Sequence, residues 1–385
     1  MTEPALPDYQ PKPSVSLIRC KSYDRGLVEA SVRRAVALLG GADRFVRPGD
    51  RVLLKPNMLS GKAPNKVVTT HPEVVRAVVR LVKEAGGIPS IGDSNALGSF
   101  AKVSEVTGMA RVARDEGAEL VELSEAVDVH GKGKFKHFEL SKAAMEADVV
   151  INLPKAKTHG QMLLTLAVKN LFGCIPGRRK AQWHFKAGVD REAFATMLVE
   201  LSGLVRPCLS IIDAVVGMEG NGPGSGTPRE VGLIGASADP HALDMVMASV
   251  LGVSADRLPT LKAARGLGLI PRSISEIELA GDFGNPAQAA VRGFRLPSES
   301  SLEWSIPEPV RRLLKESLTS KPRIHRKSCK LCLMCQTACP VGAITEGRDG
   351  MSIDYRACIR CFCCQEVCPV GAIDIAEGWL LRYLG

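Results

Sequence analysis

Hydrophobic and polar positions alternate between two patterns through roughly the first 280 residues. Short apolar runs rich in β-branched residues predict strands, and longer stretches with apolar residues three and four positions apart predict helices between them. The predicted strands cover residues 15–19, 51–55, 88–92, 119–123, 148–153, 209–215 and 230–235. The predicted helices cover residues 25–39, 72–85, 102–116, 191–204 and 240–251. This alternation is typical of an α/β fold with a mostly parallel sheet and helices on both faces.

Cysteine is concentrated near the C-terminal end of the sequence. Nine of the twelve cysteines lie between Cys329 and Cys368, and in a long chain such crowding favours metal ligation over a disulfide scaffold. The segments CKLCLMCQTACP (residues 329–340) and CIRCFCCQEVCP (residues 358–369) both match the bacterial 4Fe-4S pattern C-x2-C-x2-C-x3-C-P. The first cysteines of the two motifs are 29 positions apart (358 − 329 = 29), and the other ligands repeat at the same offset. The two motifs therefore form an internal duplication.

The spacing predicts two 4Fe-4S clusters with crossed ligands. Three thiolates two residues apart cap three iron corners of one cluster, and the fourth cysteine of each motif reaches the other cluster. Cluster one would be held by Cys329, Cys332, Cys335 and Cys368, and cluster two by Cys358, Cys361, Cys364 and Cys339. Cys363 fits no position of the pattern, and we interpret it as a spare thiol. The module resembles the two-cluster bacterial ferredoxins, which implies a small α+β domain.

Changes in composition divide the chain into five parts. Gly, Pro, Ser and scattered charge after the last predicted strands indicate a linker. A further candidate strand covers residues 275–279 and could close the sheet. We expect a flexible N-terminus (1–14), an α/β domain (15–281), a linker (282–324), a two-cluster ferredoxin domain (325–378) and a C-terminal tail (379–385).

Polar residues follow three of the predicted strands at the point where each strand ends. Lys55 ends the second strand and Asn57 follows it, Asp93 follows the third, and Lys155 lies just after strand 148–153. Ligands of open α/β sheets collect at the carboxyl ends of the strands, so we expect one crevice there. The candidate ligand-binding residues are Lys55, Asn57, Asp93, Lys155, Lys157, His159, Lys169, Asn170, Asp213 and Glu219.

Positive charge dominates this set of residues. The lysines of the crevice are joined by Arg178, Arg179 and Lys180 in the loop GCIPGRRKAQWH, and such a set favours an anionic small molecule, carboxylate or phosphate. Neither a Walker sequence nor a strand-borne G-x-G-x-x-G is present, so no nucleotide fingerprint supports a more specific ligand. We interpret the glycine-rich segment GNGPGSG (residues 220–226) as a flexible loop or lid in preference to a phosphate cradle.

Further carboxylates leave two chemical alternatives open. Asp213, Glu219, Asp239 and Asp244, together with His159 or His184, could supply acid–base chemistry or bind a divalent metal. Asp239 precedes Pro240 and is also a simple helix cap. A flavin is compatible with the sequence because many flavin sites lack a short motif, but no residue pattern indicates one.

A family resemblance rests on an ordered series of motifs. These are LLKPN (53–57), TTHPEVV (69–75), GDS (92–94), NLPKAKTH (152–159), VKNLFG (168–173), IIDAVVGMEGNGPG (211–224) and SADPHALD (237–244). Their order resembles the family known as domain of unknown function 362, over residues 15 to 280. Members often carry a two-cluster ferredoxin at the C-terminus, so the resemblance implies this architecture and an iron-sulfur role.

The formal charge of +9 bears on partners and location. Eight basic residues precede or adjoin the first cluster motif: Arg311, Arg312, Lys315, Lys321, Arg323, Arg326, Lys327 and Lys330. Two interpretations explain these basic residues: a solvated linker, or a docking face for an acidic redox partner. We expect no nucleic-acid partner, because aromatic residues make up only 4% of the chain and no stacking platform is apparent. No signal peptide and no long apolar run occur, so we expect a cytoplasmic protein without membrane insertion.

Three functions fit these features. In the first, a ferredoxin-coupled reductase passes electrons through the two clusters to an anionic substrate or cofactor in the α/β domain. In the second, a redox adaptor or maturation factor docks to a partner enzyme. In the third, a non-redox enzyme keeps the clusters for structure. The fusion of a two-cluster module to a domain with a ligand crevice favours the first function, an oxidoreductase.

Overall fold

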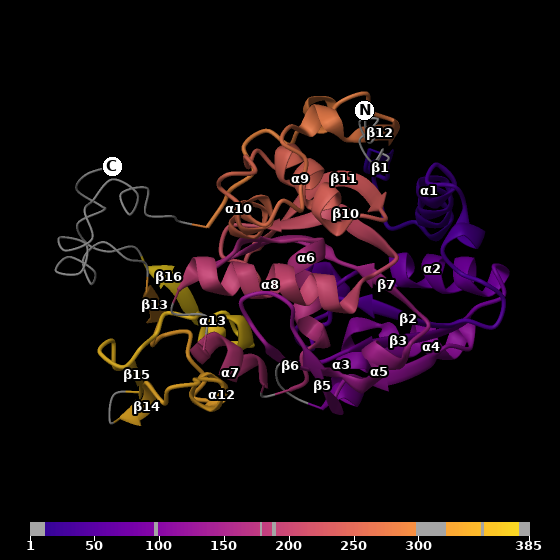
Figure 1. Ribbon diagram of the computed structural model, residues 1–385. Coiled ribbons are helices and arrows are strands. Elements are labelled where there is room, and N and C mark those ends of the chain that lie inside the picture. Colours follow the sequence, from indigo (N-terminus) through magenta and orange to yellow (C-terminus); the bar gives the residue numbers. More distant parts are fainter. Residues whose placement is uncertain are drawn as a thin grey trace, which may run out of the picture.

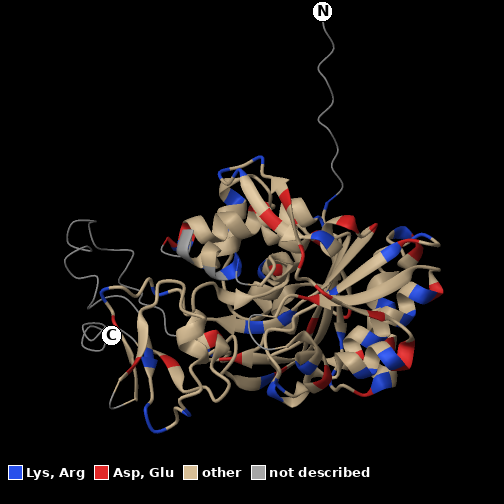
Figure 2. Cartoon of the chain, turned by 90° about the horizontal axis from the view of Figure 1, so that it is seen from below, with Lys and Arg blue, Asp and Glu red and all other residues tan. Residues whose placement is uncertain are grey.

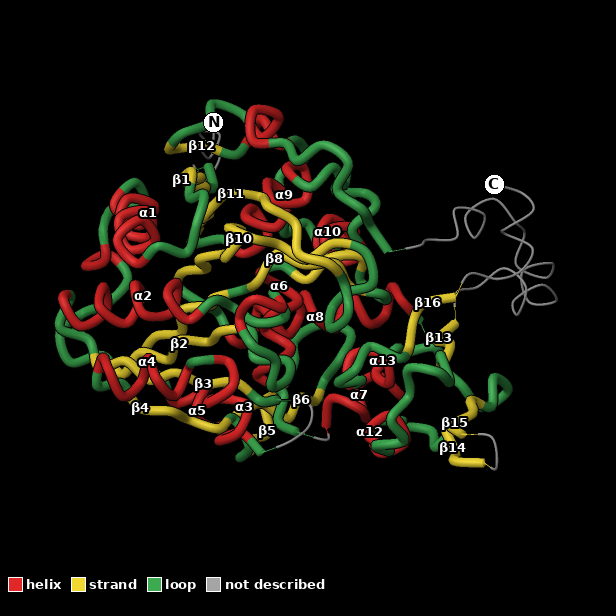
Figure 3. Tube along the Cα trace, turned by 180° about the vertical axis from the view of Figure 1, so that it is seen from behind, coloured by secondary structure: helices red, strands yellow, loops and turns green. Residues whose placement is uncertain are grey.

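The structure is a computed structural model that describes residues 12–95, 99–177, 179–186, 190–297, 321–347 and 350–376. A ten-stranded sheet runs through these described residues (Figures 1 and 3). Eight strands follow one another in the order β12 (Glu278–Gly281), β1 (Ser14–Arg19), β11 (Thr227–Ser237), β10 (Leu209–Glu219), β7 (Val149–Leu153), β2 (Arg51–Pro56), β3 (Ile88–Asp93) and β4 (Glu119–Glu122). β8 (Lys155–His159) pairs with β10 and with β9 (Leu163–Thr165).

Most strand pairs are parallel. β10, β7, β2, β3 and β4 form a continuous parallel series, and β12 is parallel to β1. Only β11 among these eight strands is antiparallel to its neighbours. The expected α/β fold is therefore confirmed. The helices of this domain are α1 (Arg25–Ala37), α2 (Pro72–Glu84), α3 (Phe100–Thr107), α4 (Met109–Glu116), α5 (Lys142–Glu146), α6 (Ala167–Asn170), α7 (Arg179–Lys186), α8 (Arg191–Val205), α9 (Pro240–Val250) and α10 (Pro259–Gly266).

Helices cover both faces of the sheet. In β2, Val52 and Leu54 pack into a core with α1, α2 and α4, whereas Leu53 belongs to a core with α8 on the other face. A third core lies between β1, β10 and α9. Burial on both faces explains why these strands appear in the sequence as continuous apolar runs rather than as alternating ones.

Two local features differ from the sequence-based expectation. The single helix expected at 102–116 is divided into α3 and α4 at Gly108, whose φ of 81° ends α3 and whose missing Cβ would lie 3.2 Å from Pro72. The hairpin of β5 (Ala126–His130) and β6 (His137–Ser141) was not expected. Its strands are short and mix polar with apolar residues, so they carry little periodicity.

The C-terminal module is a small α+β unit. It contains β13 (Lys321–Ile324), α12 (Met334–Thr337), β14 (Ile344–Gly347), β15 (Gly350–Ile353), α13 (Cys363–Val367) and β16 (Ile373–Ala376). Leu331 and Leu333 adopt left-handed φ values of 51° and 58°, and Arg360 and Phe362, 29 positions later, adopt 56° and 59°. The duplicated sequence therefore folds as two equivalent loop–helix units. The module lies beside α7 at one edge of the molecule (Figures 1 and 3).

The predicted boundaries of the linker were wrong at both ends. β13 pairs with β16, so the module already includes Lys321 rather than beginning at residue 325. At the other end, Phe283 packs into the core with α9, and the Val291 amide donates to the Val250 carbonyl at 2.9 Å. Residues 282–297 therefore belong to the α/β body. They pack as irregular structure, which the Gly- and Pro-rich sequence does not reveal.

Other predictions concern residues outside the described ranges. These are residues 1–11 of the N-terminus, Arg178, the centre of the expected linker with Arg311, Arg312 and Lys315, and the tail 379–385. Among the helices that are described, none has the length and apolar character needed to cross a membrane. The cytoplasmic location stays a prediction.

Candidate functional site

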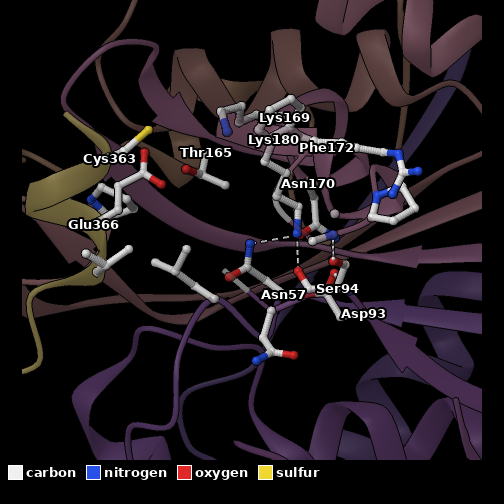
Figure 4. A pocket seen from close by; sticks show the side chains of 18 of the residues that line it. Asn57, Asp93, Ser94, Thr165, Lys169, Asn170, Phe172, Lys180, Cys363 and Glu366 are labelled. Atoms are coloured by element: carbon white, nitrogen blue, oxygen red, sulfur yellow. Dashed lines mark hydrogen bonds between the residues drawn. The ribbon is translucent and has the colours of Figure 1, made fainter. Parts of the chain in front are cut away.

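A cavity of about 460 Å³ lies where the carboxyl ends of the strands meet the C-terminal module. Lys55 at the end of β2 and Asp93 at the end of β3 line it from the α/β domain. Cys363 and Glu366 of α13 line it from the module (Figure 4). This is the edge at which open α/β sheets bind ligands. The lining also includes Asn57, Ser94, Lys157, His159, Thr165, Lys169, Asn170, Phe172, Lys180 and His184.

Lys55 and Asp93 form a buried ion pair on the cavity wall. Lys55 Nζ donates to Asp93 Oδ1 at 2.9 Å, and Asp93 Oδ2 accepts the Met58 amide at 2.7 Å. Gly173 approaches so closely that a Cβ there would lie 2.1 Å from Asp93 Oδ1 and 2.4 Å from Lys55 Nζ. The glycine of VKNLFG is therefore required by this contact. Because each charge has its partner, the pair presents a fixed dipole to the cavity rather than a net positive charge.

A chain of side-chain amides holds Lys157. Lys157 Nζ donates to Asn57 Oδ1 at 2.9 Å and to the Val68 carbonyl at 2.6 Å. Asn57 donates to Asn170 at 2.8 Å, and Asn170 donates to Asn152 at the same distance. Burial lowers the pKa of Lys157 to about 7. This ammonium group can therefore exchange a proton with a ligand near neutral pH.

His159 joins β8 to the ferredoxin module. Its Nδ1 accepts the amides of Gln161 and Met162, both at 3.1 Å, so the ring proton resides on Nε2. Nε2 lies 2.8 Å from Glu366 Oε1. Burial lowers the pKa of His159, whereas the neighbouring Glu366 raises it. Burial alone would raise the pKa of Glu366, but His159 and Lys169 lower it to about 2, so the carboxylate is anionic.

Lys169 differs from the other lysines that line the cavity because it forms no hydrogen bond or ion pair with any residue that the structure describes. It is 8% exposed, and its Nζ lies 4.6 Å from the centre of the Phe172 ring. Thr165 Oγ1 and His184 Nδ1 are also buried without hydrogen-bond partners among the described residues. In Figure 4, Thr165 and Lys169 face Cys363 and Glu366 across the cavity. These unpaired polar atoms form the part of the cavity most suited to a ligand.

The opposite end of the cavity is closed by the segment that follows Pro176. Lys180 donates to the Ser94 carbonyl, and Ser94 Oγ accepts the Gly177 amide at 2.8 Å. Burial lowers the pKa of Lys180 to about 8. Arg179 pairs with Glu139 at 2.5 Å. At this end the basic side chains already have protein partners.

The structure brings seven of the ten predicted ligand residues to the cavity: Lys55, Asn57, Asp93, Lys157, His159, Lys169 and Asn170. Lys155, Asp213 and Glu219 do not line it, so their predicted place in the crevice was wrong. Lys155 Nζ contacts Asp213 Oδ2 at 2.8 Å and the Tyr23 hydroxyl at 2.7 Å, because Asp213 is the partner of Lys155 in the β10–β8 register. Glu219 pairs with Arg295 at 2.8 Å.

The remaining carboxylates are helix caps. Asp239 accepts the His241 amide at 2.8 Å at the start of α9, and Asp244 accepts the Ala167 amide at 2.6 Å at the start of α6. Burial raises the pKa of Asp244 to about 8, but the group does not line the cavity. Within the described ranges, no three His, Cys, Asp or Glu side chains converge so as to hold a metal ion. The divalent-metal alternative therefore has no site there.

Eight cysteines of the module form two groups. Cys329, Cys332, Cys335 and Cys368 line one small cavity. Burial raises the pKa values of Cys358 and Cys364, and the nearby charge of Cys339, the fourth cysteine of the first motif, adds to both shifts. Cys335 of the first motif also adds to the shift of Cys364. The crossed assignment of the ligands stays a prediction.

The two groups have the chemistry of 4Fe-4S ligands. All twelve cysteines are unpaired thiols. The Ala343 amide donates to Cys339 Sγ at 3.2 Å, and the Ala372 amide, 29 positions later, donates to Cys368 Sγ at 3.1 Å. Amide–sulfur bonds of this kind stabilise thiolate ligands and tune cluster potentials. Each thiolate of a cluster binds a different iron atom, so the sulfurs surround a volume rather than a single ion.

The segment GNGPGSG joins the two domains. Gln365 Nε2 of α13 donates to Asn221 Oδ1 at 2.8 Å and to the Gly222 carbonyl at 3.2 Å. A Cβ at Gly224 would lie 3.0 Å from the Glu366 carbonyl. The glycines thus allow close approach of α13, and Pro223 of the segment lines the cavity. Our interpretation of this segment as a flexible loop or lid stays a prediction.

Sequence reasoning missed several cavity residues, among them Thr165, Cys363 and Glu366. A comparison of the two cysteine motifs does point to Cys363 and Glu366. Cys363 corresponds to Met334 (363 − 29 = 334), and Glu366 corresponds to Thr337 (366 − 29 = 337). The second copy therefore carries a thiol and a carboxylate that the first lacks, and both line the cavity.

The fold and the cysteine groups together define an iron-sulfur protein in which a 4Fe-4S module is packed on an α/β domain. Comparison with protein families agrees. Residues 52–249 match the family described as "Domain of unknown function (DUF362)", and residues 321–369 match the "4Fe-4S dicluster domain". The chain belongs to the DUF362 family, as the order of its motifs suggested.

A relative covers most of the chain. The thylakoid-associated protein sll1697 of Synechocystis sp. is 45% identical over 303 residues, which are 78% of this chain and 94% of that protein. Solved structures are less similar. The lactate racemase apoprotein of Thermoanaerobacterium thermosaccharolyticum has a TM-score of 0.39 at 12% identity, over 61% of this chain and 56% of that one. A Thermotoga maritima protein has a TM-score of 0.38 at 12% identity, over 68% and 61%. The match spans less than two thirds of either structure, and we base no argument on it.

Proposed function

We propose that this protein is an oxidoreductase that passes electrons through two 4Fe-4S clusters to an anionic substrate in the cavity between its domains. The observation that supports this proposal is the position of helix α13. Cys364 of α13 belongs to the second cysteine group, while Cys363 and Glu366 of the same helix line the cavity. When bound, the clusters supply one-electron steps whose potentials depend on their surroundings.

The charge of the cavity favours an anion that binds at Lys169. The other lysines on the wall already donate to protein oxygens, whereas Lys169 has no such partner among the described residues. Thr165 and His184 supply further unpaired polar atoms beside it. Phe172 packs against the lysine and excludes water, which strengthens its attraction to an anionic group. We propose a carboxylate or a phosphate at this position.

Lys157 is the candidate proton donor. Reduction of a double bond in an organic anion consumes two electrons and two protons. A lysine with a pKa of about 7 is protonated in about half of the molecules at neutral pH and releases this proton readily, which is the property of an efficient general acid. Asn57 fixes the position of its ammonium group.

We further propose that an acidic redox partner delivers electrons at the first cysteine group. Cys332 is exposed, and the apolar side chains of Leu331, Leu333 and Val370 beside this group are 48%, 38% and 47% exposed. Exposed basic residues lie close to Cys329 in the sequence: Arg326, Lys327 and Lys330. Lys and Arg occur on the loops of the module at the edge of the molecule (Figure 2). An apolar centre with a basic rim suits an acidic protein surface.

A reoxidation experiment tests the proposed activity. The protein is purified and reduced without oxygen, freed of excess reductant and mixed with organic anions that carry a reducible group, such as 2-oxo acids and α,β-unsaturated carboxylates. We expect one class to restore the visible absorbance of the oxidised clusters with saturating kinetics and to yield its reduced product.

Lys169→Met is the discriminating variant in this experiment. It should keep the full iron content. The substrate concentration that gives half of the maximal reoxidation rate should rise at least tenfold. Reoxidation that is equally fast in this variant, or no reoxidation by any anion, contradicts the proposal. If the clusters can be reduced but no anion reoxidises them, the favoured function is that of a redox adaptor.

A further inference from the structure

The two halves of the duplicated module differ at positions that face the cavity. Met334, at the start of α12, lines the small cavity of the first cysteine group, whereas its counterpart Cys363, at the start of α13, lines the ligand cavity. Thr337 lies at the cavity but is exposed and has no carboxylate, whereas its counterpart Glu366 lines the cavity with a carboxylate that contacts His159. The backbone is equivalent in the two halves, so these differences reflect the surroundings of each half rather than the fold of the motif.

Cys363 connects the cavity to the second cysteine group. Its thiol is hydrogen-bonded to the ligand Cys361, and it directly precedes the ligand Cys364. On the other side, the Cys363 side chain faces the space in front of Lys169 and Thr165 (Figure 4). Cys363 therefore lies between the cluster-two ligands and the unpaired cation of the cavity.

Among the described residues, the first cysteine group has no comparable contact with the cavity. Cys332 of that group is exposed, and Leu331 and Leu333 beside it are exposed as well. Thr337, two positions after Cys335, and Val367, which precedes Cys368, are described cavity-lining residues close in sequence to members of this group. Solvent near Cys332 screens charges, whereas the interior around Cys363 does not.

We propose that Cys363 and Lys169 make cluster two, and not cluster one, responsive to the ligand: an anion bound against Lys169 lowers the reduction potential of cluster two. This inference rests on the proposed function for the presence of an anion in the cavity, but it concerns binding rather than turnover. A bound anion places negative charge near the cluster-two ligands and disfavours the additional negative charge that comes with reduction. It also neutralises Lys169, whose positive charge favours the reduced state.

The coupling is reciprocal. If an anion lowers the potential of cluster two, reduction of cluster two must weaken anion binding by the same free energy. A tenfold weakening corresponds to about 59 mV for a one-electron couple. An anion would then bind more tightly to the oxidised protein than to the reduced protein.

Potentiometric titration followed by paramagnetic resonance tests this inference. The full-length protein with both clusters is titrated in sulfate and in chloride at equal ionic strength, and Cys332→Ser identifies the signals of cluster one. We expect sulfate to lower the potential of cluster two and to leave that of cluster one unchanged. Lys169→Met should abolish the response to sulfate. Cys363→Ala should lower the potential of cluster two even in chloride, because the hydrogen bond to Cys361 is lost, and Cys363→Ser should restore part of the shift.

Met334→Ala is the matched control, because it changes the equivalent position of the first motif. It should leave the response of cluster two to sulfate intact. Equal shifts of both clusters, or a response to sulfate that persists in Lys169→Met, would overturn the inference. Absence of turnover with every organic anion, combined with a shift confined to cluster two, would refute the proposed reductase and leave this inference standing.

Discussion

Gly173 lies so close to the Lys55–Asp93 pair that its replacement tests the importance of that pair. We expect Gly173→Ala to lower the free energy of unfolding by about 1–3 kcal/mol, because the new methyl group would push apart a buried ion pair. Gly203 in α8 serves as the control, because a Cβ at this position would meet no heavy atom outside its own helix backbone within 4 Å. Gly203→Ala should raise stability by about 0.5–1 kcal/mol. Denaturant unfolding of both variants measures the difference, and equal stabilities would contradict the importance of the close contact.

The pKa values of two cavity lysines predict how anion binding depends on pH. Lys157 and Lys180 have pKa values of about 7 and about 8, so both are cationic at low pH and lose their charge as the pH rises through these values. Affinity for sulfate, which does not titrate in this range, should therefore fall between pH 6 and 9 as these two charges are lost. Calorimetry at several pH values measures the fall. Lys157→Met should remove the part of the fall in affinity that is centred near pH 7. An unchanged pH profile in this variant would refute the contribution of Lys157 to anion binding.

At the scale of residues, the sequence revealed part of the site. Lys55 and Asp93 were predicted because they end parallel strands, and the strand order brings such ends together. The sequence could not show that Lys155 pairs with Asp213 away from the cavity, since that contact depends on the register of β8 against β10. Nor could it distinguish Lys169, whose lack of a partner among the described residues becomes visible only when the neighbours of every lysine are known.

At the scale of elements, Gln365 tests how α13 is attached to the α/β domain. Gln365→Leu removes its hydrogen bonds to Asn221 and Gly222 and leaves buried acceptors unpaired, so it should cost about 1–3 kcal/mol. Gln336→Leu changes the matching position of the first motif, where the side chain is only half-buried, and should be nearly neutral. Thermal unfolding and limited proteolysis compare the two variants. Equal sensitivity of both would show that these contacts do not hold the module.

The elements themselves were largely predictable. Strands buried on both faces give long apolar runs, and all seven predicted strands are present. The break between α3 and α4 depends on the positive φ of Gly108, which a helical pattern does not reveal. The cysteine motifs were the most informative segments, because each ligand position is fixed by the geometry of a cluster and recurs at one offset.

At the scale of the whole molecule, the basic face near Cys332 predicts a salt-sensitive reaction with an acidic electron donor. Lys330→Glu should slow the second-order reduction of the protein by an acidic plant-type ferredoxin at least threefold at low ionic strength. The difference should shrink as salt is added, because screening weakens steering between exposed charges. Stopped-flow absorbance measures the rate. Reduction by dithionite, a small molecule, should be changed much less, and an equal loss with both reductants would argue against docking at this face.

In the proposed function, each end of the module has a separate task. The first cysteine group reaches solvent at Cys332, and the second adjoins the cavity through α13. The sequence indicated the α/β domain and the cluster module but not the contact between them, because Glu366 and His159 are far apart in the chain. The contact between the domains is what makes electron transfer to a cavity ligand the best-supported function.

The most direct test of this account is anaerobic purification of the full-length protein, with iron and sulfide quantification, paramagnetic resonance before and after reduction, and mass spectrometry of released small molecules. The account predicts two reducible 4Fe-4S clusters and a co-purified organic anion that Lys169→Met fails to retain. Clusters that resist reduction, together with no bound anion in either form, would contradict it.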